Sequence, residues 1–253
     1  MNRFIISKEL EEYVDKHMTS FNCGAHDVLH AYRVANLAVQ IAEVEKLKNG
    51  IDIDLRLVFI SGLVHDVLDT KLINENDSSS IEDTLIKILS SYGTDEQKLT
   101  LSEANKVISI IKSVGYKNLL SPTYNVYEKS IEYRCVQDAD LLDAIGAVGV
   151  GRCFAFGGRM KRSMFGGIDV DDKENLTQEK YKEQQKQNVG SGVAHFFDKL
   201  LKLKDMMSTV KGKELAVKRH QFMIDFLNQV DDELVDSSYD EAGNIRKRIK
   251  LLS

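Results

Sequence analysis

The sequence predicts an all-α protein, and three observations support that prediction. The chain has 253 residues and a single proline, Pro122, whereas an all-β chain of this length needs many turns, in which proline is common. Apolar residues recur at helical spacing over several long segments without a helix breaker. The composition, 43% hydrophobic and 29% charged, is ordinary for a globular protein and argues against a disordered or fibrous chain.

Three helices are expected in the first part of the chain. The first covers 8–20 and the second 26–48, because apolar residues recur every three or four positions along one face of each segment. The third covers 54–68 and is apolar nearly all round, which is typical of a helix in the middle of a bundle.

The rest of the chain is expected to alternate between loops and helices. The polar segment 74–80 and the proline-containing segment 115–125 are predicted loops, and the basic, glycine-rich segment 157–183 is a predicted surface loop or lid. Further helices are expected at 81–91, at 102–113, at 129–143 with a glycine-rich continuation over 144–156, at 186–208 and at 211–233. No linker marks a boundary, so one domain over 1–235 is expected, followed by a charged, loose tail over 236–253.

Charge, cysteine usage and apolar segments exclude several classes of protein. The formal net charge is −5, so the chain lacks the basic excess that nucleic-acid binding requires. The three cysteines are far apart and form no CxxC pair, which indicates a reducing compartment. The N-terminus lacks the apolar core of a signal peptide, and no apolar stretch is long enough to span a bilayer. The expectation is a cytoplasmic protein with no nucleic-acid or membrane partner.

Three features of the sequence could bring metal ligands together. His26, His30 and Arg33 are spaced i, i+4 and i+7, so they lie on one face of the second helix. The pair His65-Asp66 ends the apolar third helix, where buried polar groups need partners and a divalent cation is one efficient partner. The third feature is the acidic run Asp138-Ala139-Asp140-Leu141-Leu142-Asp143. Two imidazoles and two carboxylates make a mixed site suited to manganese, iron, cobalt, nickel or zinc, with positions left open for water and substrate.

These residues carry a resemblance to a known family. His30 with its His-x-x-Arg-Val flank, the Gly-Leu-Val-His-Asp segment ending at Asp66, and the Asp-Ala-Asp-x-Leu-Asp-Ala-Ile-Gly-Ala run around Asp140 resemble the HD-domain metal-dependent phosphohydrolases, in particular the small stand-alone members. The resemblance covers roughly residues 20–210. It implies a single helical bundle with one divalent metal ion held by His30, His65, Asp66 and Asp140, and Asp138 and Asp143 remain possible substitutes for Asp140.

The same resemblance bears on the metal and on catalysis. No histidine occurs between positions 66 and 194, which favours one metal ion over two, with Mn²⁺ preferred and Fe²⁺, Co²⁺, Ni²⁺, Zn²⁺ or Mg²⁺ as alternatives. Asp69 follows His65 by one helical turn and is a candidate base for the attacking water, with a structural hydrogen-bond acceptor as the alternative. Lys71 is a candidate for charge neutralisation or a residue that complements the helix dipole.

Five further residues are candidates for phosphate contacts, each with a plainer structural alternative: His26, Arg33, Arg152, His195 and Lys199. Arg152 and Lys199 are more often solvated helix charges, His195 could be a core residue, and His26 could cap its helix. Arg33 could instead clamp a carboxylate. His17 and His220 have no partner pattern and are expected at the surface.

The expected function is hydrolysis of a nucleoside or deoxynucleoside triphosphate to monophosphate and pyrophosphate. One alternative is a nucleoside monophosphate phosphatase of the 5′-nucleotidase type, and another is an HD module that senses a nucleotide without turning it over. The departure from the alarmone hydrolases of the superfamily, which carry a second acid where this chain has Thr70, argues against alarmones as substrate. The expected partner is a small nucleotide or phosphate ester, and the protein is expected to be a monomer or a homodimer.

Overall fold

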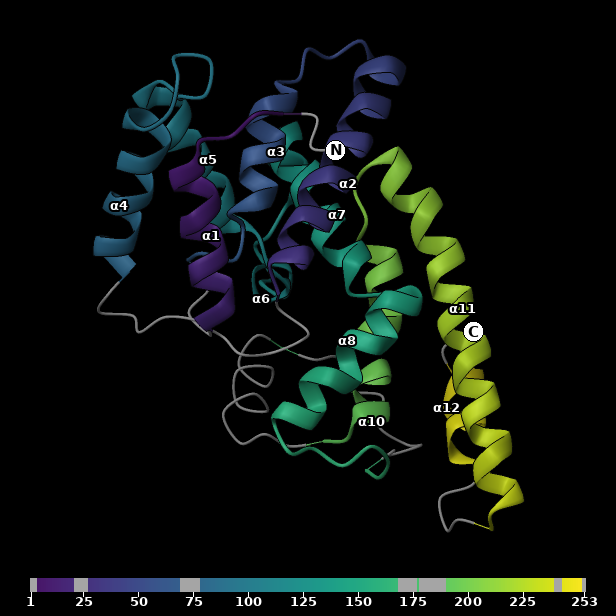
Figure 1. The fold of residues 1–253 in the computed structure, drawn as a ribbon. Coiled ribbons are helices and arrows are strands. Elements are labelled where there is room, and N and C mark those ends of the chain that lie inside the picture. The colour runs from purple at the N-terminus through teal and green to yellow at the C-terminus, as the bar shows by residue number, and fades with distance from the viewer. Residues whose placement is uncertain are drawn as a thin grey trace. The chain divides into compact units, whose positions relative to one another are not determined.

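The computed structural model describes residues 4–20, 27–68, 78–167, 177, 190–238 and 243–251. All regular elements in these ranges are helices, so the predicted all-α class is confirmed (Figure 1). The chain forms two compact units, the first made of Met1–Gly115, Asn125–Asp140 and Ser208–Gly212, and the second of Tyr116–Tyr124, Leu141–Met207 and Lys213–Ser253.

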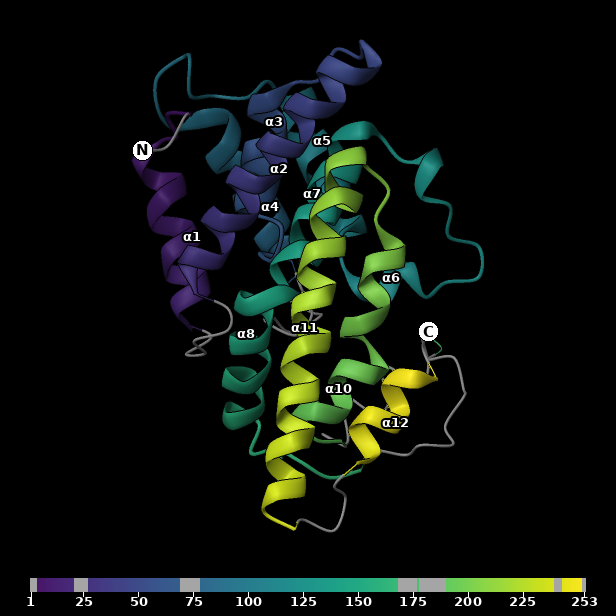
Figure 2. The same cartoon turned by 90° about the vertical axis from the view of Figure 1, so that its right-hand side faces the viewer.

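The first unit is built around helix α2. Its elements are α1 (Lys8–Ser20), α2 (Val28–Asn49), α3 (Leu55–Leu63), α4 (Ser78–Ser91), α5 (Leu101–Ser113), the 3₁₀ helix η2 (Val126–Glu128) and most of α7 (Ile131–Asp143). Helix α3 packs against α2 and α5, while α1 packs against α2 and α4 (Figures 1 and 2). Val34 and Ala38 of α2 and Val58 and Phe59 of α3 are fully buried. This apolar packing holds α2 and α3 together.

The second unit contains a small aromatic core. Its elements are α6 (Tyr116–Leu119), α8 (Gly146–Arg159), α10 (Gly192–Asp198), the 3₁₀ helix η3 (Leu200–Met206), most of α11 (Val210–Asp236) and α12 (Asn244–Lys250). The rings of Phe154 on α8, Phe196 on α10 and Phe226 on α11 lie 6.0 to 6.1 Å apart, centroid to centroid. Three helices distant in sequence therefore share one core.

Several element boundaries differ from those expected. The apolar segment 54–68 is helical only to Leu63 and then forms a turn over 64–68. The segment expected to be helical over 186–208 is interrupted between α10 and η3, and the segment 115–125 contains the short helix α6. Helix α8 continues through two glycines to Arg159, so the described part of the segment 157–183 is a loop only beyond that residue. Most of the rest of that segment lies outside the described residues.

Part of the tail expected to be loose is helical. Helix α12 lies within 236–253, and its Ile245 is fully buried. Arg246 of α12 pairs with Asp232 of α11, and the backbone N–H of Gly243 donates to Asp231 at 3.0 Å. One apolar side chain and these polar contacts fix this helix to α11.

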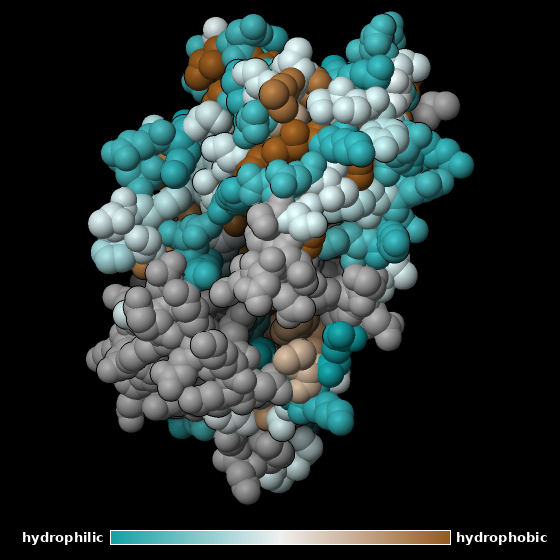
Figure 3. Space-filling view, turned by 90° about the vertical axis from the view of Figure 1, so that its left-hand side faces the viewer, coloured by the Kyte–Doolittle hydropathy of each residue, from teal (hydrophilic) through white to brown (hydrophobic). Residues whose placement is uncertain are grey.

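On the face drawn in Figure 3, hydrophilic residues lie beside smaller hydrophobic areas. Among the described residues, no single helix is both long enough and apolar enough to cross a bilayer, and α7 and α8 reach that level only when taken together.

Candidate metal centre

His30 is positioned by the first turn of α2. Asp27 is the N-cap of this helix, and its carboxylate accepts a 2.8 Å hydrogen bond from the backbone N–H of His30. The side chain of His30 is 1% exposed. The helix start therefore places an imidazole in the interior of the first unit.

His65 is positioned by a close contact between α2 and α3. A Cβ added to Gly62 would lie 2.7 Å from the Cα of Ala35, so the two backbones can approach this closely only because residue 62 is glycine. The carbonyl oxygen of Gly62 lies 2.8 Å from Nδ1 of His65. That contact assigns the proton to Nδ1 and leaves the Nε2 lone pair of the neutral ring for a metal ion.

The two imidazoles and two carboxylates converge in the first unit. Nε2 of His65 lies 3.3 Å from Asp66 and 3.6 Å from Asp140, and Nε2 of His30 lies 3.4 Å from Asp66 and 3.9 Å from Asp140. The two rings meet edge to face with their centroids 5.0 Å apart. Asp66 follows His65 in the turn after α3, and Asp140 lies on α7. Three separate chain segments therefore supply the cluster.

These separations suit a shared metal ion. Two ligand atoms bound to one ion at the usual distances and angles lie roughly 3 to 3.5 Å apart, which is close to the histidine–carboxylate distances here. The ligand atoms of His30, His65 and Asp66 all lie within 4.8 Å of one another. Nε2 of His65 is buried and makes no hydrogen bond of good geometry to any described residue. A buried ring nitrogen in this state needs a partner, and a cation is a suitable one.

The carboxylates also determine the local electrostatics. Burial alone would lower the pKa of His65, but Asp66 and Asp140 outweigh it and raise that pKa to about 9. Burial would raise the pKa of the Asp140 carboxyl, yet the neighbouring His65 holds it below its usual value. In the protein without metal, positive charge on the His65 imidazole therefore compensates the two acids.

The other two acids of the α7 run have different partners. Asp138 is fully buried and accepts hydrogen bonds from Ser208 and Thr209, while Asp143, in the second unit, pairs with Arg152 at 3.0 Å. Both carboxylates are engaged elsewhere, and neither lies in the histidine cluster that the structure describes. Of the three acids in this run, Asp140 is the one beside the imidazoles.

The other predicted site residues are not all described. His26, Asp69 and Lys71 lie outside the described residues. Arg33 follows His30 by three positions on α2, and its guanidinium lies 4.0 Å from the carboxylate of Asp27. Arg33 therefore belongs to the same helix end as His30.

The remaining candidates for phosphate contact belong to the second unit. Arg152 makes the ion pair with Asp143 just described, in which both side chains are largely buried. The amine of Lys199 lies 4.8 Å from the centre of the Tyr116 ring. His195 lies on α10, half-buried.

His17, expected at the surface, is half-buried in the first unit. Its ring stacks on Tyr13 at 6.2 Å, and burial lowers its pKa while the charge of Asp66 acts in the opposite direction. His17 is thus within electrostatic reach of the cluster. The sequence carried a signal for this half-burial. His17 has helical spacing with Val14 and lies next to Met18, and both of these residues are buried on the inner face of α1.

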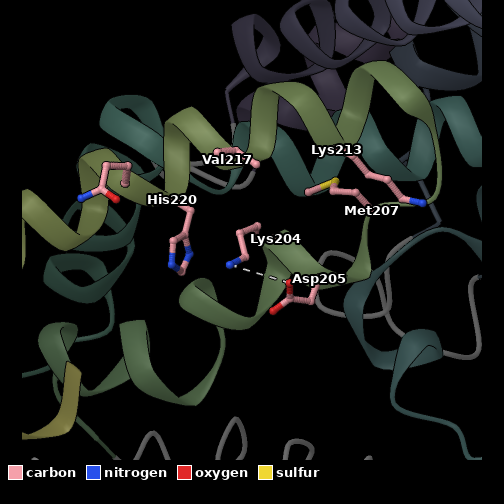
Figure 4. Close-up of a pocket in the computed structure, with 7 residues that line it drawn as sticks. Lys204, Asp205, Met207, Lys213, Val217 and His220 are labelled. Atoms are coloured by element: carbon pink, nitrogen blue, oxygen red, sulfur yellow. Dashed lines mark ion pairs between the residues drawn. The ribbon is translucent and has the colours of Figure 1, made fainter. Parts of the chain in front are cut away.

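A groove of about 400 Å³ occurs in the second unit between η3 and α11 (Figure 4). It is lined by Lys204, Asp205, Met207, Lys213, Val217, His220 and Gln221. Lys204 and Asp205 form an ion pair at 3.8 Å within it, and burial lowers the pKa of His220. His220 is half-buried beside this groove and not freely at the surface.

Comparison with known proteins identifies the family. A model of the HD domain matches residues 28–145, a range that contains His30, His65, Asp66 and Asp140. The chain belongs to the HD-domain hydrolase family, as the resemblance implied.

Its relatives include a bacterial protein of known structure. The chain is 34% identical over 230 residues to YpgQ of Bacillus subtilis, covering 90% of this chain and 93% of YpgQ. The crystal structure of YpgQ in complex with ADP matches with a TM-score of 0.60 and 32% identity, covering 89% of this chain and 96% of the other. An HD-superfamily hydrolase from Bacillus thuringiensis matches with a TM-score of 0.54 and 28% identity, covering 88% and 97%.

Proposed function

We propose that this protein is a metal-dependent phosphohydrolase that converts nucleoside or deoxynucleoside triphosphates to monophosphates and pyrophosphate. The observation that carries the proposal is the convergence of His30, His65, Asp66 and Asp140 in the first unit. Two relatives support it: YpgQ has been solved in complex with ADP, and the Bacillus thuringiensis protein is described as a hydrolase.

The donor set fits a divalent cation of intermediate hardness, and Mn²⁺ is the ion proposed. His30 and His65 would offer Nε2, and Asp66 and Asp140 would each offer a carboxylate oxygen. When bound, such an ion would act as a Lewis acid toward a phosphate oxygen and would lower the pKa of a bound water molecule. These four protein ligands would leave positions open on the ion for water and substrate oxygens.

The protein's own groups would orient the reactants. Gly62 holds the ring of His65 through Nδ1, so the direction of Nε2 is fixed before any ligand arrives. Asp69 is proposed to accept the proton of the attacking water. The water oxygen bonds to the α-phosphorus, the bond from that phosphorus to the oxygen bridging to the β-phosphate breaks, and pyrophosphate leaves.

Arg33 is the phosphate-contacting residue proposed on α2. It lies three positions after His30, so the two side chains share a helix face, and the Arg33 side chain is 38% exposed. Exposure lets its guanidinium turn from Asp27 to a phosphate, for which the planar fork of donors is suited. His26 and Lys71 are proposed as additional cations, as are Arg152, His195 and Lys199, of which Arg152 would have to exchange Asp143 for the substrate.

The decisive experiment is a product assay on purified protein loaded with Mn²⁺. Nucleoside triphosphates, deoxynucleoside triphosphates and monophosphates are supplied one at a time, and phosphate and pyrophosphate are measured separately. Pyrophosphate release that a chelator abolishes supports the proposal. Release of phosphate from monophosphates would instead indicate a monophosphate phosphatase. Nucleotide binding without any product would indicate a nucleotide sensor.

Asp69 can be tested in the same assay. Asp69→Asn keeps size and polarity but removes the base, so turnover is expected to fall roughly 100-fold or more while Mn²⁺ stoichiometry stays at the wild-type value. Unchanged turnover would contradict a role for Asp69 as base. Asp95→Asn, at a fully exposed carboxylate, is the matched control.

A further inference from the structure

The first unit contains a short segment that is held by buried acids from two helices. Residues Ser208–Gly212, here called the 208–212 strap, include the first turn of α11. The backbone N–H groups of Ser208 and Thr209 donate to Asp138 on α7, and that of Val210 donates to Glu45 on α2 at 2.6 Å. Three successive backbone N–H groups therefore donate hydrogen bonds to buried carboxylates.

Asp138 is the more completely bonded of the two acids. Besides the two N–H groups, it accepts from the hydroxyls of Ser208 at 3.1 Å and Thr209 at 2.6 Å. Its residue is fully buried, so a carboxylate there is tolerated because donors surround it. A Cβ on Gly212 would lie within 2.3 Å of Asp138, which shows how closely the strap packs on this acid.

The position of Asp138 on α7 connects the strap with the metal centre. Asp138 and Asp140 are two positions apart, roughly 200° around a helix, so they lie on opposite sides of α7. One side is tied to the strap by Asp138, and the other presents Asp140 to His30 and His65. A rotation of α7 about its axis would break the first set of contacts and change the direction of the Asp140 carboxylate.

We propose that Asp138 is a positioning residue for the metal centre: through the 208–212 strap it fixes the rotation of α7 and thereby the direction of the Asp140 carboxylate. The inference rests on the proposed metal site. Asp138 does not touch the metal ligands. Removing its hydrogen bonds is expected to weaken metal binding in addition to destabilising the fold.

Glu45 provides an internal control for this proposal. It is also buried and also holds the strap, but it lies about four helical turns from His30 along α2. Glu45→Gln should loosen the strap without turning α7. The two acids therefore separate loss of stability from loss of ligand geometry.

The test measures Mn²⁺ affinity of the full-length protein by calorimetry, well below the melting temperature of each variant. Asp138→Asn places an amide NH₂ against the donors of Ser208 and Thr209 and is expected to weaken Mn²⁺ binding about 10- to 100-fold, the usual range for groups that orient metal ligands. Glu45→Gln should lower the melting temperature but leave affinity within about twofold. Equal loss of affinity in both variants would overturn the proposal.

A second pair of variants keeps the proposal testable if Asp138→Asn does not fold. Thr209→Val removes the hydroxyl that donates to Asp138, and Thr209→Ser retains it. Weakened Mn²⁺ binding in Thr209→Val with recovery in Thr209→Ser supports positioning, and equal affinity in both variants refutes it. The visible spectrum of bound Co²⁺, which reports ligand geometry, should shift in Thr209→Val and not in Thr209→Ser.

If the wild-type protein binds no divalent ion, the proposed function fails. If the wild-type protein and all variants bind the ion equally well, only the positioning role of Asp138 fails.

Discussion

Asp138 and Asp140 are chemically identical and lie two positions apart on α7, yet their surroundings differ completely. Asp138 accepts hydrogen bonds from two backbone N–H groups and two hydroxyls. Asp140 instead lies 3.6 and 3.9 Å from two imidazole nitrogens. The difference shows that burial alone does not distinguish a candidate metal ligand from other buried acids. What distinguishes Asp140 is that its neighbours are themselves metal-ligand types.

The largest effect is expected from Asp140→Asn. Loss of one anionic ligand should reduce turnover by about 1,000-fold or more, which corresponds to roughly 4 kcal/mol, and should reduce the Mn²⁺ content of the purified protein. Metal content is measured by elemental analysis and turnover by pyrophosphate release. Full metal occupancy in this variant would remove Asp140 from the ligand set, and Asp95→Asn is the control for loss of a carboxylate charge.

The next effect concerns stability and falls on the other acid. Asp138→Asn leaves buried donors facing an amide, so the free energy of unfolding should decrease by about 3 kcal/mol. The measurement is urea denaturation of the metal-free protein. Asp140→Asn should change that free energy less, because its carboxylate is partly exposed and His65, its partner in the metal-free protein, keeps Asp66 at 3.3 Å. Similar losses of unfolding free energy in the two variants would contradict the assignment of Asp138 as the structural acid and Asp140 as the metal ligand.

Chelation tests the ligand side of the comparison without mutation. A ligand present at 100 times its dissociation constant stabilises the folded state by about 2.7 kcal/mol, equivalent to roughly 5 to 10 °C in melting temperature for a protein of this size. Removing Mn²⁺ from the wild-type protein should therefore lower its melting temperature by that amount. Asp140→Asn should show almost no response to the chelator. A response equal to that of wild type would mean that the stabilising ion binds elsewhere.

Much of the fold could be predicted because periodicity reports directly on helices. The apolar stripes placed α1, α2 and α5 within about two residues of their observed bounds. The turn after Leu63 could not be predicted in this way. There the His65 ring bonds to the carbonyl of Gly62, and a side chain that competes with the helix for a backbone group leaves no trace in the apolar pattern.

The motif resemblance singled out His30, His65, Asp66 and Asp140, which the structure brings together, but residue spacing by itself gave only a set of residue types. The motif around Asp140 contains three aspartates, and their spacing alone did not exclude Asp138 or Asp143. The partners of Asp138 lie 70 and 71 positions away, and only tertiary packing brings them together. The half-burial of His17 could have been predicted from its helical spacing with Val14 and Met18, but its proximity to Asp66 could not, because no periodic signal connects α1 with that residue.

The smallest effect concerns the contact between α2 and α3 that brings His30 and His65 together. Gly62→Ala would place a methyl group 2.7 Å from the Cα of Ala35, so the helices must separate, at a cost of about 1 to 3 kcal/mol in unfolding free energy. Because His65 lies three positions later and its Nδ1 contacts the carbonyl oxygen of Gly62, Mn²⁺ affinity should fall as well. Gly151→Ala is the matched control, since nothing lies within 4 Å of the added group and alanine favours a helix by about 0.5 to 1 kcal/mol over glycine. Denaturation and calorimetry on the two variants decide the matter: if Gly62→Ala is as stable and binds Mn²⁺ as tightly as Gly151→Ala, close packing of α2 and α3 does not set the distance between the imidazoles.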